Sequence, residues 1–393
     1  MPQAEPVDVS KGTKGKSPTK ASKDSHAGAA SLDSDGAQMR SQAAIFPTAL
    51  NDTWRQCLAS MQQLLAPLMP VIKRALPEIP SAPTETSVTP PPGAKAPAVK
   101  KGAEDAARSS SIGHKVLLLV DPELRTLPFE ALSYLKSNCS SVARCPSLHM
   151  LHVASKGSLS GGAAASEASA GPIFDLSGLT YIVDPKSEGS SPEDARGPYS
   201  PPLIPTFKST LHTDFKDWKG YMGIPNRIPA EAELLQLVTS SSGLVFLGMG
   251  RFMSYVSPSI VSSVDLRGCE LAILMGCVNN AKAHQRQLYL DNRKSLVERS
   301  LESPMRAAEL LLARGVKTVV MVTMATTAQT NCDMLRAIFS ALQGGATVAE
   351  AVWSTLKGCA FELDHVQSGV VVMGLPHMMA GGGKGGAKGA KGK

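Results

Sequence analysis

The chain has 393 residues, 43% of them hydrophobic, and a formal net charge of +7. No run approaches the ~20 apolar residues of a membrane span, and the first residues lack the apolar core of a signal peptide, so we expect a soluble intracellular protein. Its seven cysteines include no C-x-x-C pair, which argues against a zinc-ribbon site and a disulfide framework.

Low-complexity segments surround one region of ordinary globular composition. Residues 1–50 are rich in Lys, Ser, Gly and Ala, and we expect them to form a disordered basic and polar segment. Residues 77–113 read as a Pro/Lys/Ser linker, and residues 377–393 as a disordered Gly/Lys-rich tail. The folded domain is therefore expected over residues 114–376.

Residues 51–76 carry the pattern of an amphipathic helix. Trp54, Leu58 and Met61 recur every three or four residues, and Pro67 and Pro70 break or kink the helix. Such a helix either binds a partner or packs on its own domain.

Short apolar runs alternate with helical patterns through the folded region. Strands are expected at 116–120, 180–183, 244–248, 270–275, 316–323 and 369–374, and helices at 229–238, 305–315, 326–345 and 347–358. This alternation indicates a mostly parallel sheet with helices on both faces. Residues 141–154 are interpreted as a strand or turn, and the basic stretch 281–303 as a polar loop.

Two of these strands end in glycine-containing turns. The strand at 244–248 leads into Gly-Met-Gly, which places Met249 at its end, and the strand at 270–275 leads into Gly276 and Cys277. Loops that follow the carboxyl ends of parallel strands form the crevice of an open α/β sheet. The two turns therefore mark a candidate site.

The order of several motifs resembles a CHAT domain, the caspase-like fold shared with separase. They are LLLVDPELRTLPFEAL, TYIVDP, IPAEAELLQL, LVFLGMGRF, CELAILMGCVNN, AAELLLARGVKTVVMVTMATT and AIFSALQGGATVAEAV. The resemblance implies an α/β, caspase-like three-layer sandwich with a mostly parallel central sheet.

Within that family the chain is most similar to the C-terminal region of cilia- and flagella-associated proteins of the central apparatus, through VDPELRTLPFEALS and GMGRF. That similarity implies a structural role in the ciliary axoneme and in cilium motility. It also implies other axonemal proteins as partners. Flexible lysines in the basic tails either attract acidic surfaces such as tubulin tails or serve solubility alone. No motif indicates a cofactor, metal, nucleic acid or membrane.

Cysteine-peptidase chemistry needs a thiolate and a neighbouring imidazole that lowers the pKa of the thiol and protonates the leaving amine. The family's histidine lies between the two glycines, where this chain has Met249. A thioether cannot transfer a proton. Met249 and Cys277 are therefore expected to be vestigial. The alternative is an active endopeptidase in which Cys277 is the nucleophile and His284, His212 or His114 is an unusual base.

Other ligand sites find less support. Cys145, His149 and His152 could offer three zinc ligands, but alternation along a strand would separate them. The Gly/Lys tail lacks the ending of a P-loop and has no interleaved aromatic residues for stacking on nucleic acid. A polyanion binder remains a third hypothesis, resting on net charge alone.

The candidate partner-binding residues are basic. They are expected to be exposed in the stretch 281–303 and in the C-terminal tail: Arg293, Lys294, Arg299, Lys384, Lys388, Lys391 and Lys393.

Overall fold

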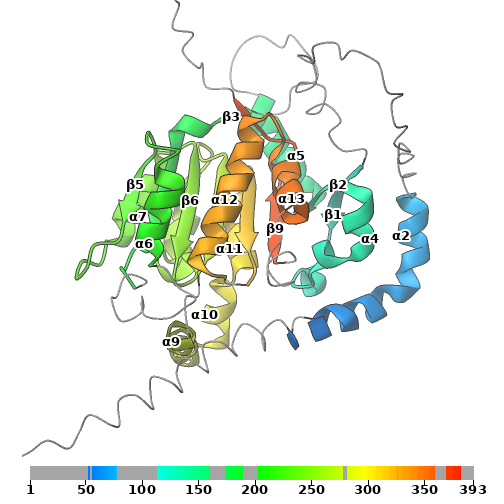
Figure 1. Ribbon diagram of the computed structural model, residues 1–393, viewed down its shortest axis with the longest axis horizontal. Coiled ribbons are helices and arrows are strands. Elements are labelled where there is room, and N and C mark those ends of the chain that lie inside the picture. The colour runs from blue at the N-terminus through cyan, green and yellow to red at the C-terminus, as the bar shows by residue number, and fades with distance from the viewer. Residues whose placement is uncertain are drawn as a thin grey trace, which may run out of the picture. The chain divides into compact units, whose positions relative to one another are not determined.

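Eight strands form one sheet in the order β1-β2-β9-β8-β7-β6-β4-β5 (Figure 1). The computed structural model describes residues 52–53, 55–77, 113–159, 173–188, 202–277, 281–324, 326–358 and 369–381. The strands are His114–Leu119 (β1), Cys139–Cys145 (β2), Leu179–Val183 (β4), Lys219–Met222 (β5), Gly243–Gly248 (β6), Leu271–Gly276 (β7), Thr318–Val322 (β8) and Val370–Gly374 (β9). Ile173–Asp175 (β3) and Met379–Gly381 (β10) pair separately.

Neighbouring strands of the large sheet are parallel except for β8 and β9. The strands β1, β2 and β9 therefore run opposite to β4–β8. The carboxyl ends of β4, β6, β7 and β8 lie along one edge of the sheet, and those of β1, β2 and β9 lie along the other. The predicted crevice belongs to the first edge.

Helices cover both faces of the sheet, as predicted. One face carries α6 (Leu203–Phe207), α12 (Ala328–Gln343) and α13 (Val348–Gly358); the other carries α7 (Glu231–Thr239), α8 (Pro258–Ser263) and α11 (Pro304–Ala313). Figure 1 shows α12 and α13 in front of the sheet. The remaining helices of the domain are α4 (Ser133–Asn138), α5 (Leu148–Leu159), α9 (Ala281–Asn292) and α10 (Leu296–Leu301).

Successive side chains of a strand point to opposite faces of the sheet, so a strand that is covered on both faces buries every residue. Along β6, Val245 and Leu247 belong to the cluster beneath α12 and α13, whereas Leu244 and Phe246 belong to the cluster beneath α7, α8 and α11. A run of consecutive apolar residues is required for such a strand, because no face of it meets water.

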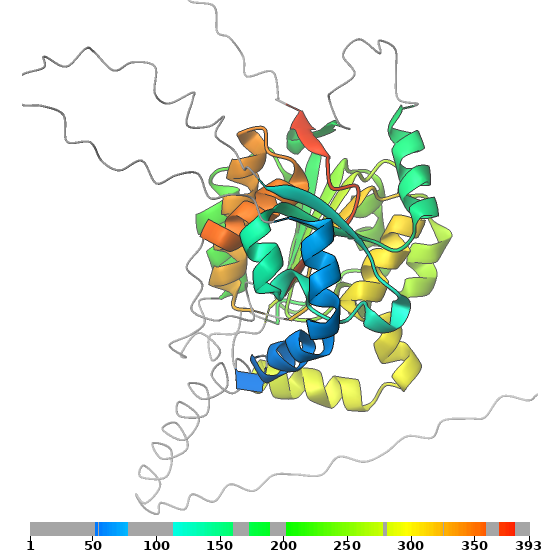
Figure 2. The ribbon, with the colours of Figure 1, turned by 90° about the vertical axis from the view of Figure 1, so that its right-hand side faces the viewer.

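The amphipathic helix before the domain packs on it. Residues 55–65 are helical, a 3-10 turn follows at Ala66–Leu68 where Pro67 interrupts the pattern, and α2 (Met69–Ala75) continues. Met61 and Leu65 are buried with the core cluster that includes Leu132 and Leu135. Figures 1 and 2 both show α2 beside α4, where the Tyr134 hydroxyl donates to the carbonyl of Leu76.

The predicted strands and long helices are present, with their ends shifted by at most two residues. Thr347 and Glu350 form a capping box at the start of α13, and Gly315, just after α11, has a positive φ of 111°. The segment 141–154, interpreted as a strand or turn, contains most of β2 and the first part of α5, so the helix was not predicted. The prediction of a loop at 281–303 is wrong, because α9 and α10 occupy it.

Several predictions concern residues outside the described ranges. The segment 1–50, nearly all of the linker 77–113 and the tail lysines Lys384, Lys388, Lys391 and Lys393 are among them. Among the described residues, no helix is both long and apolar enough to span a bilayer.

Candidate functional site

The two glycine-containing turns lie side by side at the carboxyl edge of the sheet. Gly248 and Gly276 are register partners at the ends of β6 and β7. The backbone N–H of Cys277 donates to the carbonyl of Gly248 at 2.7 Å. Met249 and Cys277 therefore occupy adjacent strand ends, as the sequence predicted.

The Cys277 thiol is enclosed by protein. It is 1% exposed, and Asn331 of α12 donates from Nδ2 to its Sγ at 3.3 Å and to the carbonyl of Gly276 at 3.1 Å. The Thr326 hydroxyl in turn donates to Asn331 Oδ1 at 2.7 Å, which fixes the orientation of the amide. Thus Asn331 holds the end of β7 against the start of α12.

Burial raises the pKa of the Cys277 thiol to about 12, and the hydrogen bond from Asn331 opposes this only in part. Desolvation penalises the thiolate, and the nearby Asp184 carboxylate acts in the same direction as burial. The thiol is therefore protonated at neutral pH, which is the reverse of what a nucleophile needs.

Met249 occupies the neighbouring position as a core residue. It is 8% exposed and belongs to the same apolar cluster as Cys277. None of the described residues that line the adjacent cavity is a histidine. At this edge, the thioether packs where a peptidase would need an imidazole.

The other histidines considered from the sequence are placed differently. His114 lies in β1, near the opposite end of the strand order, and bonds the carbonyl of Pro77 at 2.9 Å. His212 follows α6 and meets the edge of the Tyr181 ring at 5.9 Å between centroids. Residue 284 lies in α9, but its side chain is outside the described part of the structure.

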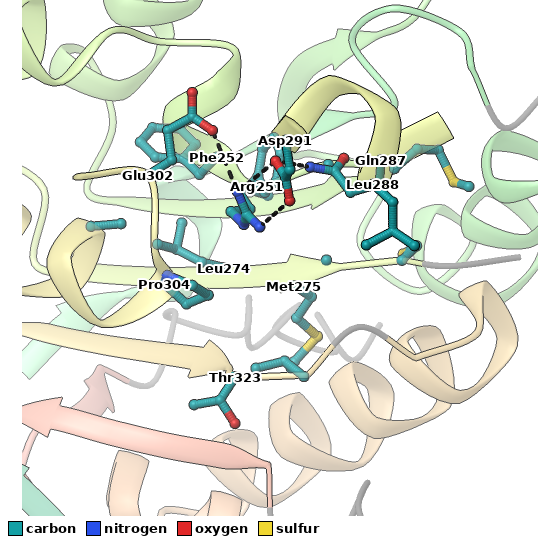
Figure 3. Close-up of a pocket in the computed structure, with 17 residues that line it drawn as sticks. Arg251, Phe252, Leu274, Met275, Gln287, Leu288, Asp291, Glu302, Pro304 and Thr323 are labelled. Carbon is teal, nitrogen blue, oxygen red and sulfur yellow. Dashed lines mark hydrogen bonds and ion pairs between the residues drawn. The ribbon is translucent and has the colours of Figure 1, made fainter. Parts of the chain in front are cut away.

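A cavity of about 270 Å³ opens beside the two strand ends (Figure 3). Phe246, Leu274 and Met275 contribute apolar side chains to its lining. Its charged lining residues are Arg251, Asp291 and Glu302. A pocket with this lining could bind an apolar group of a ligand, with the charged residues at its edge contacting polar groups of the same ligand.

Ion pairs attach α9 and α10 to the end of β6. Arg251 forms a two-pronged pair with Asp291 of α9, at 3.0 Å (Nη1 to Oδ1) and 2.6 Å (Nη2 to Oδ2), and lies 3.6 Å from Glu302 (Figure 3). Lys294 donates to the same Glu302 carboxylate at 2.6 Å. Because both acids are mostly buried, this network is stronger than an exposed pair would be.

Local sequence accounts for the helical form of 281–303. Ser295 accepts from the N–H of Glu298, whose carboxylate accepts from the N–H of Ser295, so a capping box starts α10. The stretch is polar enough to have suggested a loop. The signal for a helix was the Ser-x-x-Glu spacing, which the sequence analysis did not use here.

The basic candidates of this stretch differ in their surroundings. All three were expected to be exposed. Arg293 is exposed, whereas Lys294, paired with Glu302, and Arg299 are only partly exposed. Arg251, Asp291 and Asn331 could not be predicted as site residues, because their partners lie 40 or more residues away along the chain.

The zinc candidates do not converge. Cys145 is buried at the end of β2 and donates to the carbonyl of Ser147, while His149 and His152 are exposed on α5. Within the described residues, no three His, Cys, Asp or Glu side chains are grouped to hold a metal ion.

No protein-family model matches the chain. The chain is 35% identical over 384 residues to cilia- and flagella-associated protein 46 of Chlamydomonas reinhardtii, a match that covers 88% of this chain and 14% of that protein. It is 27% identical over 164 residues to separin of Emericella nidulans, covering 42% of this chain and 7% of that protein. The chain thus spans only a small part of the length of either relative.

Solved structures with a similar fold include two crystal structures of the Saccharomyces cerevisiae separase–securin complex. Their TM-scores are 0.48 and 0.47, at 19% and 18% identity, and each match covers 68% of this chain and 16% of the matched chain. The cysteine proteinase gingipain R has a TM-score of 0.39 at 11% identity, covering 61% of this chain and 55% of that one.

Proposed function

Since this chain contains a separase/CHAT-like domain related to a cilia- and flagella-associated protein, we propose that it is a non-catalytic scaffold of the ciliary axoneme. In this proposal the domain is a degenerate peptidase fold in the central apparatus. It binds other axonemal proteins and supports cilium motility.

The observation that carries the proposal is the state of Cys277. A peptidase nucleophile must be accessible and must have a base, whereas this thiol is 1% exposed and has a pKa raised to about 12. Met249, its neighbour across the strand ends, cannot accept a proton. With a buried thiol and no base beside it, the fold can still present a rigid binding surface, but it lacks the proton transfer that peptide hydrolysis requires.

Cysteine alkylation tests the absence of catalysis. The chain is treated with iodoacetamide at neutral pH, and modification of each cysteine is followed by mass spectrometry. Cys57 is exposed and serves as the internal reference. With its pKa near 12, Cys277 has roughly a thousandfold smaller thiolate fraction than an ordinary thiol, so we expect its modification to be at least about a hundredfold slower than that of Cys57.

The alternative of an active endopeptidase is tested with an electrophilic peptide that reacts with catalytic thiols. If the trap labels Cys277 faster than Cys57, and Cys277→Ala abolishes that labelling, the chain is an active endopeptidase with a base supplied from elsewhere, and the scaffold proposal is wrong.

The axonemal part is tested separately in ciliated cells. A tagged wild-type chain and its Cys277→Ala variant should both be found on axonemes, because neither needs a working thiol. Signal confined to the nucleus or to the cytosol in both would reject the assignment to the cilium.

A further inference from the structure

The helices α9 and α10 expose an unusual amount of apolar side chain. Six large apolar residues between positions 288 and 301 are exposed, and we call them the α9–α10 apolar surface: Leu288 (48%), Tyr289 (59%), Leu290 (40%), Leu296 (76%), Val297 (68%) and Leu301 (48%). On α10, Val297 and Leu301 are four residues apart and share one side of the helix. Clusters of this kind mark binding sites more often than isolated exposed residues do.

Most of this surface does not pack against the domain, although Leu288 also lines the cavity beside β6 and β7. Asp291 of α9 faces the domain, where it pairs with Arg251 (Figure 3). Tyr289 lies two residues earlier, which places it about 160° around the helix from Asp291. The two helices are therefore held to the domain by ion pairs, while much of their apolar side faces solvent.

The charges around the surface are not balanced. The acids Asp291 and Glu302 are engaged with Arg251 and Lys294, and Glu298 caps its own helix. Arg293 and Arg299 have no acidic partner among the described residues. Arg293 lies over the Tyr289 ring at 5.4 Å, and Arg299 Nε is buried without a hydrogen-bond partner in the part of the chain that is described.

We propose that the α9–α10 apolar surface binds an acidic amphipathic helix of another protein. The apolar side of such a helix would cover residues such as Val297 and Leu301, and its flanking carboxylates would pair with Arg293 and Arg299. The inference rests on the proposed scaffold function and specifies the chemistry of one partner.

Two other occupants fit less well. In a symmetric dimer the same surface meets itself, so each copy would bring two unpaired arginines and, among the described residues, no acid that is not already engaged. An anionic membrane is usually recognised by a cluster of about four to eight basic residues, and this surface offers only two unpaired cations among its described side chains.

The test uses the full chain and a fluorescein-labelled peptide of roughly 20 residues built from leucine and glutamate heptads, long enough to form a helix. Two matched peptides replace every Glu with Lys or every Leu with Ser. Binding is followed by fluorescence anisotropy at low and high salt. We expect the Leu/Glu peptide to bind at least about tenfold more tightly than either matched peptide, and less tightly at high salt.

Variants then locate the binding surface. Val297→Asp and Arg299→Glu should each weaken binding of the Leu/Glu peptide by about tenfold or more. Val71→Asp is the matched control, because Val71 is 65% exposed on α2 and lies outside the proposed surface. Circular dichroism establishes that all three variants are folded.

Three results would overturn the inference. The first is equal binding of the Lys peptide, and the second is unchanged binding by Val297→Asp. The third is that Val297→Asp abolishes a different interaction: either self-association of the chain, measured by sedimentation, or its binding to vesicles that contain phosphatidylserine. If peptide binding fails while the tagged chain is still found on axonemes, only this inference is wrong; if the chain is absent from axonemes, the proposed function is wrong whatever the peptide does.

Discussion

Removing the carboxylate of Glu130 should destabilise the domain strongly. Glu130 lies in the LPFEAL motif and pairs with Arg144 of β2, and both side chains are almost completely buried, at 2% and 3% exposure. Arg144 Nε donates to Glu130 Oε1 at 2.6 Å, and its other nitrogens donate to Glu130 Oε2 and to the carbonyls of Arg125 and Leu127. One guanidinium thus holds both the carboxylate and the turn that precedes it.

The expected loss of unfolding free energy depends on which charge each variant leaves buried without a partner. Glu130→Ala leaves the Arg144 cation buried without its counter-charge, which costs roughly 3–5 kcal/mol of unfolding free energy. The double variant Glu130→Met/Arg144→Met removes both charges, so we expect a loss well below the sum of the two single losses. Part of the loss should remain, because the carbonyls of Arg125 and Leu127 then lack their donor.

Urea unfolding followed by circular dichroism measures these differences. The matched control is Glu233→Ala, which breaks the pair with Arg227 in which the side chains are 39% and 52% exposed; it should cost only a few tenths of a kcal/mol, about 0.5 at most. The reasoning is refuted if Glu130→Ala costs no more than this control, or if the double variant loses as much as the two single variants together.

The remaining predictions concern two glycines of the backbone, the Cys277 thiol and the Arg251–Asp291 ion pair. Gly374→Ala should cost more than about 3 kcal/mol in urea unfolding, because its φ is +104° and a Cβ would lie 2.2 Å from a backbone carbonyl oxygen, whereas Gly345→Ala, at φ +87° with open space, should cost about 1–2 kcal/mol; equal costs would contradict this. The alkylation rate of Cys277 should rise about tenfold per pH unit between roughly pH 7 and 10 without levelling off, because its pKa is raised to about 12; a plateau near pH 9 would indicate an ordinary thiol. Asp291→Asn should speed amide exchange in α9, because a mostly buried ion pair is lost, and Glu233→Gln, which changes an exposed acid, should leave it unaltered.

Much of the fold could be predicted because its strongest signals are local. The apolar runs at 244–248, 270–275 and 316–323 are too short for helices and are bounded by turns, and all three are strands. The Thr347–Glu350 spacing and Gly315 marked helix ends for reasons contained within a few residues. The α5 helix and the short edge strand β5 were missed, since neither has an uninterrupted apolar pattern.

The sequence by itself determined what is absent from the site: a methionine at position 249 cannot transfer a proton in any fold. It also placed Cys277 at the end of a strand. Only the tertiary structure decided that the thiol is buried under Asn331, 54 residues away along the chain, and that its pKa is raised. The pairing of Arg251 with Asp291, 40 residues apart, likewise leaves no local trace. Such contacts depend on which strands and helices become neighbours, and pairing between distant segments is not encoded in the periodicity of either one.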